Sequence, residues 1–283
     1  MVIESLISPL KAEAKPLKMM LFGFIYTSIA IFLGWWIFKE QSSLVFVFLT
    51  TMAAVPLMYN TIKLEEKKDC MNLPEKTLLR EHGRALALFM NLFVGVTLAC
   101  TVWYTFLPNN IISFLFKIQS DTIIQINSTV TGFSIRNFEI FTKILSNNLK
   151  VLIFCVLFSF LYGVGAIFIL TWNASVIGVA IGNFIRSEFY KISSSLGFTY
   201  LTNYFHIVSI GLFRYAIHGI PEILSYFTAG LAGGIISTAV IKHDFGTKAY
   251  EKIVMDSSLL LLLSFFLIVT AAFLEVFVTP VLF

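Results

Sequence analysis

Residues 214–241 read RYAIHGIPEILSYFTAGLAGGIISTAVI, and this stretch joins a polar run to a long apolar one. As a helix, the apolar part at 223–241 would cover about 28 Å, close to the roughly 30 Å hydrocarbon core of a bilayer. Its small residues, Gly230 and Gly233 among them, are typical of helices that approach their neighbours closely. The stretch therefore predicts a membrane-spanning helix packed inside a helical bundle.

The polar run places Arg214, His218 and Glu222 four residues apart, and a continuous helix would bring all three to one face. Ionisable side chains are costly in lipid, so we expect them to face the protein interior. Glu275, near the end of the last apolar stretch, either reaches the membrane surface or turns inward to pair with Arg214 or His218. These four residues form a candidate intramembrane polar site, either a structural hydrogen-bonded lock or a site for ions or transported solutes.

Two residues in the same run predict a break in the helix. Pro221 has no N–H and crowds the preceding turn, and Gly219 lies two residues before it. We expect the break between Tyr215 and Glu222. Ionisable groups beside a broken helix often mark a solute pathway in membrane proteins.

The composition of the whole chain fixes its class. Of 283 residues, 58% are hydrophobic and 13% are charged, whereas ordinary soluble domains carry about 25% charged residues. The net charge of +4 assembles no basic face, so we do not expect nucleic-acid binding. The three cysteines lack metal or redox spacing, and no HExxH, GxSxG or paired-aspartate motif occurs. We expect an all-α polytopic membrane protein that is not an enzyme and holds no metal or cofactor.

The order of apolar stretches predicts about seven crossings. A turn at 171–175 would break the apolar sequence, leaving a stretch at 174–185 that covers only about 18 Å as a helix. We therefore expect interrupted or half helices near 174–222. The longer apolar stretches are residues 19–38, 44–59, 85–107, 151–170, 223–241 and 257–279.

Charge bias predicts the orientation. Residues 61–84 form a polar loop with six Lys and Arg, and cationic loops stay in the cytoplasm. The N-terminus is then cytoplasmic, residues 108–148 are outside, and the C-terminus is outside. The chain divides into a three-helix region at 1–107, an amphipathic outer segment at 108–148 and a core membrane domain at 149–283. The outer segment lies either along the membrane surface or on the protein's own outer face.

Several small and polar residues have packing roles in this interpretation. Asn147 and Asn148 are expected to start a helix by satisfying its free N–H groups. Asn173 either caps a helix or bonds to a neighbouring one. Gly178 and Gly182 form a small-xxx-small pair suited to close helix contact.

Motifs in the second half, taken together, carry a family resemblance. They are Ser146-Asn147-Asn148, Tyr162-Gly163-Val164-Gly165, Asn173 with Gly178 and Gly182, His218-Gly219-Ile220-Pro221-Glu222, Ala229-Gly230-Leu231-Ala232-Gly233 and the closing residues 271–280. Over about residues 138–283 the chain resembles the stage II sporulation protein M family of integral membrane proteins. The family pattern usually reads His-Gly-x-Phe-Glu-x-Pro, whereas here Pro221 precedes Glu222 and no proline stands at 224.

The resemblance implies a polytopic helical protein without known enzymatic activity. The namesake helps to localise a cell-wall-degrading complex in spore-forming bacteria, but relatives occur in organisms that never sporulate. One hypothesis is therefore a scaffold or accessory subunit in the cell membrane, with protein partners docking on 108–148 or 61–84, or a homo-oligomer. The alternative is a transporter or channel. A water-accessible cavity that reaches Glu222 would favour transport, and a dry interior with a broad apolar groove would favour the scaffold.

Overall fold

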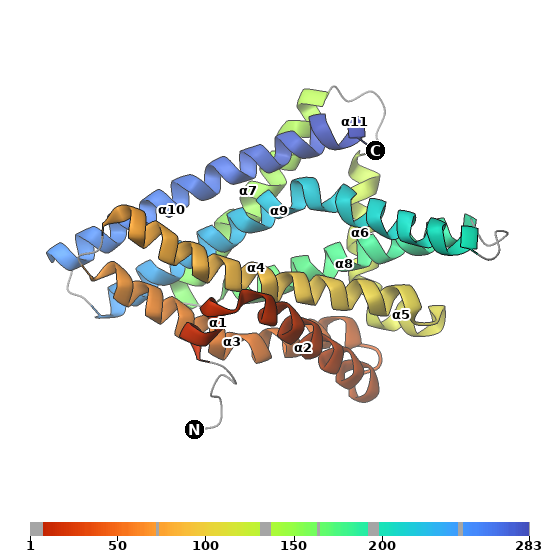
Figure 1. The fold of residues 1–283 in the computed structure, drawn as a ribbon, viewed down its shortest axis with the longest axis horizontal. Coiled ribbons are helices and arrows are strands. Elements are labelled where there is room, and N and C mark those ends of the chain that lie inside the picture. Colours follow the sequence, from red (N-terminus) through yellow and green to blue (C-terminus); the bar gives the residue numbers. More distant parts are fainter. Residues whose placement is uncertain are drawn as a thin grey trace.

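The computed structural model describes residues 8–71, 74–130, 137–162, 165–191, 198–242 and 246–282, and these contain helices and no strand (Figure 1). The helices are α1 (Pro9–Ala14), α2 (Pro16–Ile37), α3 (Ser42–Asp69), α4 (Glu75–Phe106), α5 (Asn109–Leu115), α6 (Lys117–Val130), α7 (Asn137–Tyr162), α8 (Ala166–Lys191), α9 (Phe198–Lys242), α10 (Lys248–Phe273), the π-helical turn η1 (Leu274–Val278) and α11 (Thr279–Leu282).

Seven helices in the described part of the chain are long and apolar enough to cross a membrane: α2, α3, α4, α7, α8, α9 and α10. This confirms the prediction of an all-α polytopic membrane protein with seven spans. The polar segment at 61–84 is not a simple loop, because α3 continues to Asp69 and α4 begins at Glu75. The described parts of the segment at 108–148 are largely helical too, as α5, α6 and the start of α7 from Asn137.

The predicted interruption at 171–175 is wrong, because α8 runs through it without a break. The polar side chains there bond to carbonyl groups of the preceding turn: the Asn173 Nδ2 donates to the Ile169 oxygen at 2.9 Å, and the Ser175 hydroxyl to the Trp172 oxygen at 2.7 Å. Such bonds satisfy polar groups within a helix. The chain turns instead near Gly165, where an added Cβ would lie 2.5 Å from the Phe158 oxygen. Gly163 lies outside the described residues.

The predicted break between Tyr215 and Glu222 is also wrong, since α9 is continuous and Pro221 lies inside it. Proline removes one backbone hydrogen bond, a loss that membrane helices tolerate when neighbouring helices enclose them. Helix α9 contacts α10, α7, α8, α3 and α4, and it is the most buried of the seven. Figure 1 shows it running lengthwise through the middle of the molecule, with α10 and α7 above it and α2 to α4 below.

Glycines lie where helices approach each other most closely. An added Cβ at Gly178 would lie 2.6 Å from the Cys100 Cβ on α4, and one at Gly182 would lie 3.0 Å from the Tyr104 Cβ. On α9, a Cβ at Gly233 would lie 2.8 Å from the Val156 oxygen of α7, and one at Gly230 would lie 3.2 Å from the Ala166 Cβ. At Gly178 and Gly233 neighbouring atoms would have to shift to admit a side chain, and at Gly182 and Gly230 they would have to give way slightly.

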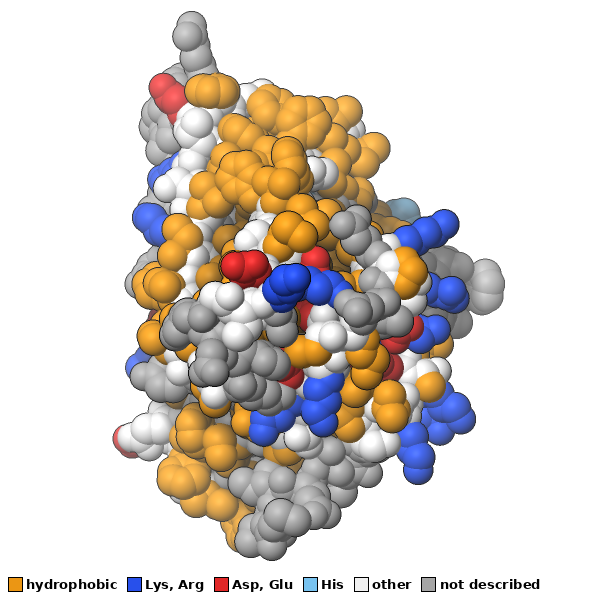
Figure 2. Space-filling view, turned by 90° about the vertical axis from the view of Figure 1, so that its left-hand side faces the viewer, with side chains coloured by type: hydrophobic (Ala, Val, Ile, Leu, Met, Phe, Trp, Pro, Cys, Tyr) orange, Lys and Arg blue, Asp and Glu red, His pale blue; other side chains and the backbone are white. Residues whose placement is uncertain are grey.

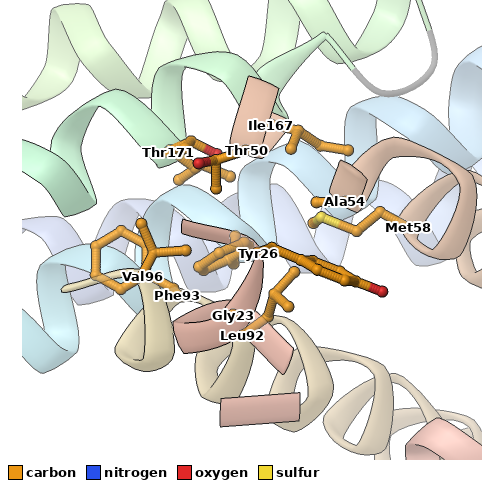
Figure 3. Close-up of a pocket in the computed structure, with 12 residues that line it drawn as sticks. Gly23, Tyr26, Thr50, Ala54, Met58, Leu92, Phe93, Val96, Ile167 and Thr171 are labelled. Atoms are coloured by element: carbon orange, nitrogen blue, oxygen red, sulfur yellow. The ribbon is translucent and has the colours of Figure 1, made fainter. Parts of the chain in front are cut away.

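A second close contact joins α2 to α4, and the sequence interpretation did not include it. Added Cβ atoms at Gly23 and Gly95 would clash with backbone oxygens of Leu92 and Met20 respectively. Beside this crossing lies an apolar cavity of only about 20 Å³, lined by α2, α3, α4, α8 and α9 (Figure 3). This space is near the minimum that holds one water molecule, so the N-terminal helices are tightly packed.

Candidate functional site: a polar cavity between α7, α8 and α9

A cavity of about 590 Å³ lies between α7, α8 and α9, with η1 and α6 completing its wall. Ligand sites commonly have volumes of about 300–1,000 Å³ and combine apolar walls with a few polar groups. The apolar part here includes Val176, Ile177 and Ala180 of α8. The polar part comes mainly from α7, α9 and η1, so this cavity is the candidate functional site.

One face of α9 contributes five residues to the cavity: Tyr215, His218, Gly219, Glu222 and Tyr226. Their spacing of three and four residues places them together only on an uninterrupted helix. The continuity of α9 through Pro221 therefore builds this wall of the site. An added Cβ at Gly219 would meet no atom within 4 Å, so its position adjoins open space.

Hydrogen bonds hold the two ionisable groups of this face. The buried Tyr226 hydroxyl donates to Oε1 of Glu222 at 2.9 Å. The His218 Nδ1 lies 3.3 Å from the Thr279 hydroxyl, which itself donates to the Leu274 oxygen at 3.0 Å. Because that hydroxyl has one hydrogen, it accepts from a His218 ring protonated at Nδ1. The polar face of α9 is thus tied to the start of α11.

Glu275 enters the cavity from η1, a short π-helical turn. The backbone N–H of Thr279 donates to the Leu274 oxygen five residues earlier, as the wider π turn requires. Pro280 follows directly, and a proline clashes with the carbonyl four residues before it, so local widening relieves the crowding. Single π turns inside long helices occur frequently at functional sites.

The facing wall on α7 has a polar stripe. Lys143, Ser146, Asn147 and Lys150 line the cavity at helical spacing, and the buried Asn148 lies beside them. The predicted role of Asn147 and Asn148 as helix-start residues is wrong, because α7 begins at Asn137. Asn173 joins the polar lining from α8.

The structure brings together three of the four residues of the predicted polar site. His218, Glu222 and Glu275 line the same cavity, whereas Arg214 is exposed, with its guanidinium 6.0 Å from the centre of the Phe184 ring. The expected partners were Arg214 and Glu275. The hydrogen-bond partners found are Tyr226 for Glu222 and Thr279 for His218.

A second polar region, at the opposite end of α4 from α5, was missed by the sequence interpretation. The Lys68 ammonium lies 3.0 Å from a carboxylate oxygen of Glu13, 2.6 Å from Glu65 and 3.2 Å from Glu81. His82 lies 2.8 Å from Glu65 through Nδ1 and 3.0 Å from Asp69 through Nε2. We call these six residues the Lys68 cluster.

The Lys68 cluster ties α1 and α3 to α4 through buried charges. Burial raises the pKa of the Glu13 carboxyl, and its hydrogen bond to Lys68 opposes that rise. In the described part of the chain no group of three or more His, Cys, Asp and Glu could hold a metal ion. The signal in the sequence was helical spacing: Glu65, Lys68 and Asp69 recur every three to four residues, as on one helix face.

Seven long apolar helices, with a partly open cavity between α7, α8 and α9 that has polar and apolar walls, define a polytopic helical membrane protein with a candidate ligand site. The family model of stage II sporulation protein M matches residues 23–280, and the chain belongs to this family. The match confirms the resemblance seen over 138–283 and extends it into the N-terminal helices. No curated protein and no solved structure matches the chain.

Proposed function

We propose that this protein is a transporter or channel that admits a polar solute to the cavity between α7, α8 and α9. The observation that carries the proposal is the cavity itself, about 590 Å³ in volume and lined by ionisable groups from three elements. The cavity reaches Glu222. A cavity of this kind favours transport, whereas a dry interior would favour a scaffold. The proposal includes no covalent step, so the protein acts without being an enzyme.

The hydrogen bonding of Glu222 supports a binding role. A carboxylate offers two oxygens with about four acceptor positions. Oε1 of Glu222 accepts from Tyr226, and the residue also lines the cavity. A residue that served only to lock helices together would be enclosed by its partners. Among the described residues, Glu222 instead has one hydrogen-bond partner, Tyr226 on its own helix, and it lines the cavity.

A counterflow experiment tests this proposal and does not require the solute to be identified beforehand. Proteoliposomes are incubated in a cell metabolite extract, and their contents are analysed by mass spectrometry. We expect at least one solute to accumulate with the wild-type protein and not with Glu222→Gln, while both variants unfold at similar temperatures. Contents that match protein-free liposomes throughout would contradict the proposal. A Lys67→Met variant, changed at an exposed residue outside the cavity, is the control.

A scaffold or accessory role is the second candidate, and a cationic end of the molecule favours it. Exposed Lys and Arg side chains gather there on α1, α4 and the start of α10 (Figure 2). Such a surface suits a partner with an acidic face. Cross-linking from Lys76→Cys and Arg80→Cys in native membranes tests it. We expect both variants to form a defined protein adduct or homo-oligomer, and Lys76→Cys to lose it when Arg80 is replaced by Glu. Persistence of the Lys76→Cys adduct in that variant would contradict docking at this surface.

The orientation in the membrane belongs to the same proposal. The Lys252 ammonium donates to the Met71 oxygen at 2.8 Å, so the starts of α4 and α10 lie at one end of the molecule. We propose that this cationic end faces the cytoplasm, with the N-terminus, and that α5 and the C-terminus face outward. An impermeant thiol reagent added to whole cells should modify Asn110→Cys and spare Lys76→Cys. The reverse pattern would contradict this orientation.

A further inference from the structure

The cavity separates its charges by sign. Its two lysines, Lys143 and Lys150, both come from α7. Among the described lining residues, the two carboxylates come from other elements, Glu222 from α9 and Glu275 from η1. The α7 wall therefore carries the lysines, and the wall of α9 and η1 carries the carboxylates.

The cation at Lys150 does not neutralise the acidic wall directly. No ion pair in the described part of the chain joins Lys150 to Glu222 or Glu275. Lys150 is exposed, whereas Glu222 and Glu275 are half-buried. Carboxylates that are partly removed from bulk water are stabilised by a partner of opposite sign. An occupant of the space between the walls can supply both partners.

We propose, on the basis of the transport function above, that the cavity binds a zwitterion with one phosphate and one ammonium group, as in phosphoethanolamine. The phosphate contacts the α7 wall and the ammonium contacts the wall of α9 and η1. A ligand with a single kind of charge would face like charges on one of the walls. A zwitterion places a charge of opposite sign against each wall. This difference in electrostatic fit makes the cavity selective for zwitterions over ligands with a single kind of charge.

The chemistry of each wall fits its half of the ligand. On α7, Ser146 and Asn147 lie between the two lysines on the same face, so hydroxyl and amide donors accompany two cations. A phosphate, with several acceptor oxygens, matches this donor set. On α9, Tyr215 and Tyr226 lie with Glu222 on the cavity face, and aromatic rings beside carboxylates favour an ammonium.

The same headgroup chemistry occurs in a free solute and in a zwitterionic phospholipid. Phosphoethanolamine alone would leave part of the roughly 590 Å³ unfilled. The remaining wall includes Val176, Ile177 and Ala180, which suit either the glycerol and acyl region of a lipid or a second small molecule. The cavity would recognise the phosphate and ammonium groups of either source in the same way. The nanodisc comparison below distinguishes the free solute from the lipid.

Calorimetric titration of the purified protein tests the proposal with three probes: phosphoethanolamine, ethanolamine and inorganic phosphate. We expect phosphoethanolamine to bind at least tenfold more tightly than either single-charge probe. Lys150→Met should weaken phosphoethanolamine and phosphate but not ethanolamine. Glu222→Gln should weaken phosphoethanolamine and ethanolamine but not phosphate. Lys117→Met, an exposed change outside the cavity lining, should alter none of them.

The source of the ligand follows from a second comparison, in nanodiscs of phosphatidylglycerol with or without phosphatidylethanolamine. Competition by phosphatidylethanolamine would identify a lipid headgroup, and unchanged affinity would identify the free solute; both results support a zwitterion site. Equal affinity for phosphoethanolamine and a single-charge probe, or no binding of phosphoethanolamine in either nanodisc, would overturn it. Glu222-dependent uptake of a different solute in counterflow would then leave the transport function standing without the zwitterion.

Discussion

The Lys68 cluster and the cavity contain the same kinds of side chains in opposite arrangements. In the cluster, one ammonium lies within 3.2 Å of three carboxylates, and the His82 ring lies within 3.0 Å of two. In the cavity, no ion pair among the described residues joins Lys150 of α7 to Glu222 of α9 or Glu275 of η1. Residue type alone therefore does not distinguish a structural cross-link from a ligand site. The distance between opposite charges does.

The comparison has an energetic consequence. A buried ion pair contributes little net stability compared with apolar packing, but removing one partner leaves an uncompensated charge and is strongly destabilising. Changes in the Lys68 cluster should therefore unfold the protein. Changes at the cavity wall should leave the fold intact and alter binding.

The largest effect is expected from Lys68→Met. Methionine keeps most of the apolar stem but leaves Glu13, Glu65 and Glu81 without their shared cation, at a cost of about 3–5 kcal/mol in the free energy of unfolding. Thermal unfolding in detergent measures the loss. Lys67→Met removes the same charge from an exposed neighbour and should change stability very little. Equal effects of the two variants would show that the cluster is not a structural cross-link.

A smaller effect is expected from alanine at two glycines of α9. At Gly233 the new Cβ would lie 2.8 Å from the Val156 oxygen, so α7 must move and stability should fall by about 1–3 kcal/mol. At Gly219 the Cβ would meet nothing within 4 Å, and alanine should be neutral or stabilising by up to about 1 kcal/mol. Unfolding curves that place Gly219→Ala below Gly233→Ala would contradict the open space beside Gly219.

The smallest effect is expected from Tyr226→Phe, which removes one hydrogen bond to Glu222. The loss should be about 1 kcal/mol in stability, because the ring and its packing remain. Tyr215→Phe is the control, since Tyr215 lines the cavity without a hydrogen bond to Glu222. A loss with Tyr226→Phe that persists in a Glu222→Leu background, where position 222 offers no acceptor, would show that this hydrogen bond is not its source.

The sequence predicted the class of fold and three of the ionisable residues that line the candidate site. Apolar length and low charge indicate seven spans, and ionisable residues at membrane depth indicate His218, Glu222 and Glu275 as site residues. The breaks were predicted wrongly, because Pro221 and the residues at 171–175 have local preferences that packing and side-chain hydrogen bonds overcome. Tertiary enclosure of α9 cannot be seen in a single sequence.

The missed features depend on contacts between distant segments. The Lys68 cluster needs α1, α3 and α4 to converge, and a charged segment considered without those contacts resembles a solvated loop. Lys143 and Lys150 become candidate site residues only because α7 and α9 line the same cavity. Arg214 failed to join the site because its position on α9 turns it toward Phe184.

The most direct test of the central claim is the reactivity of a thiol placed at Gly219. Cys70→Ser provides the background, because Cys100 and Cys155 are buried. A thiol reacts with a charged, water-soluble methanethiosulfonate reagent only as a hydrated thiolate. If the cavity is a water-filled ligand site, Gly219→Cys, whose Cβ meets no atom within 4 Å, reacts at least tenfold faster than Ser225→Cys, and phosphoethanolamine slows it. Ser225 is enclosed against α10, where its hydroxyl donates to the Ser264 oxygen at 2.8 Å. Equal, slow rates at the two positions would contradict the account.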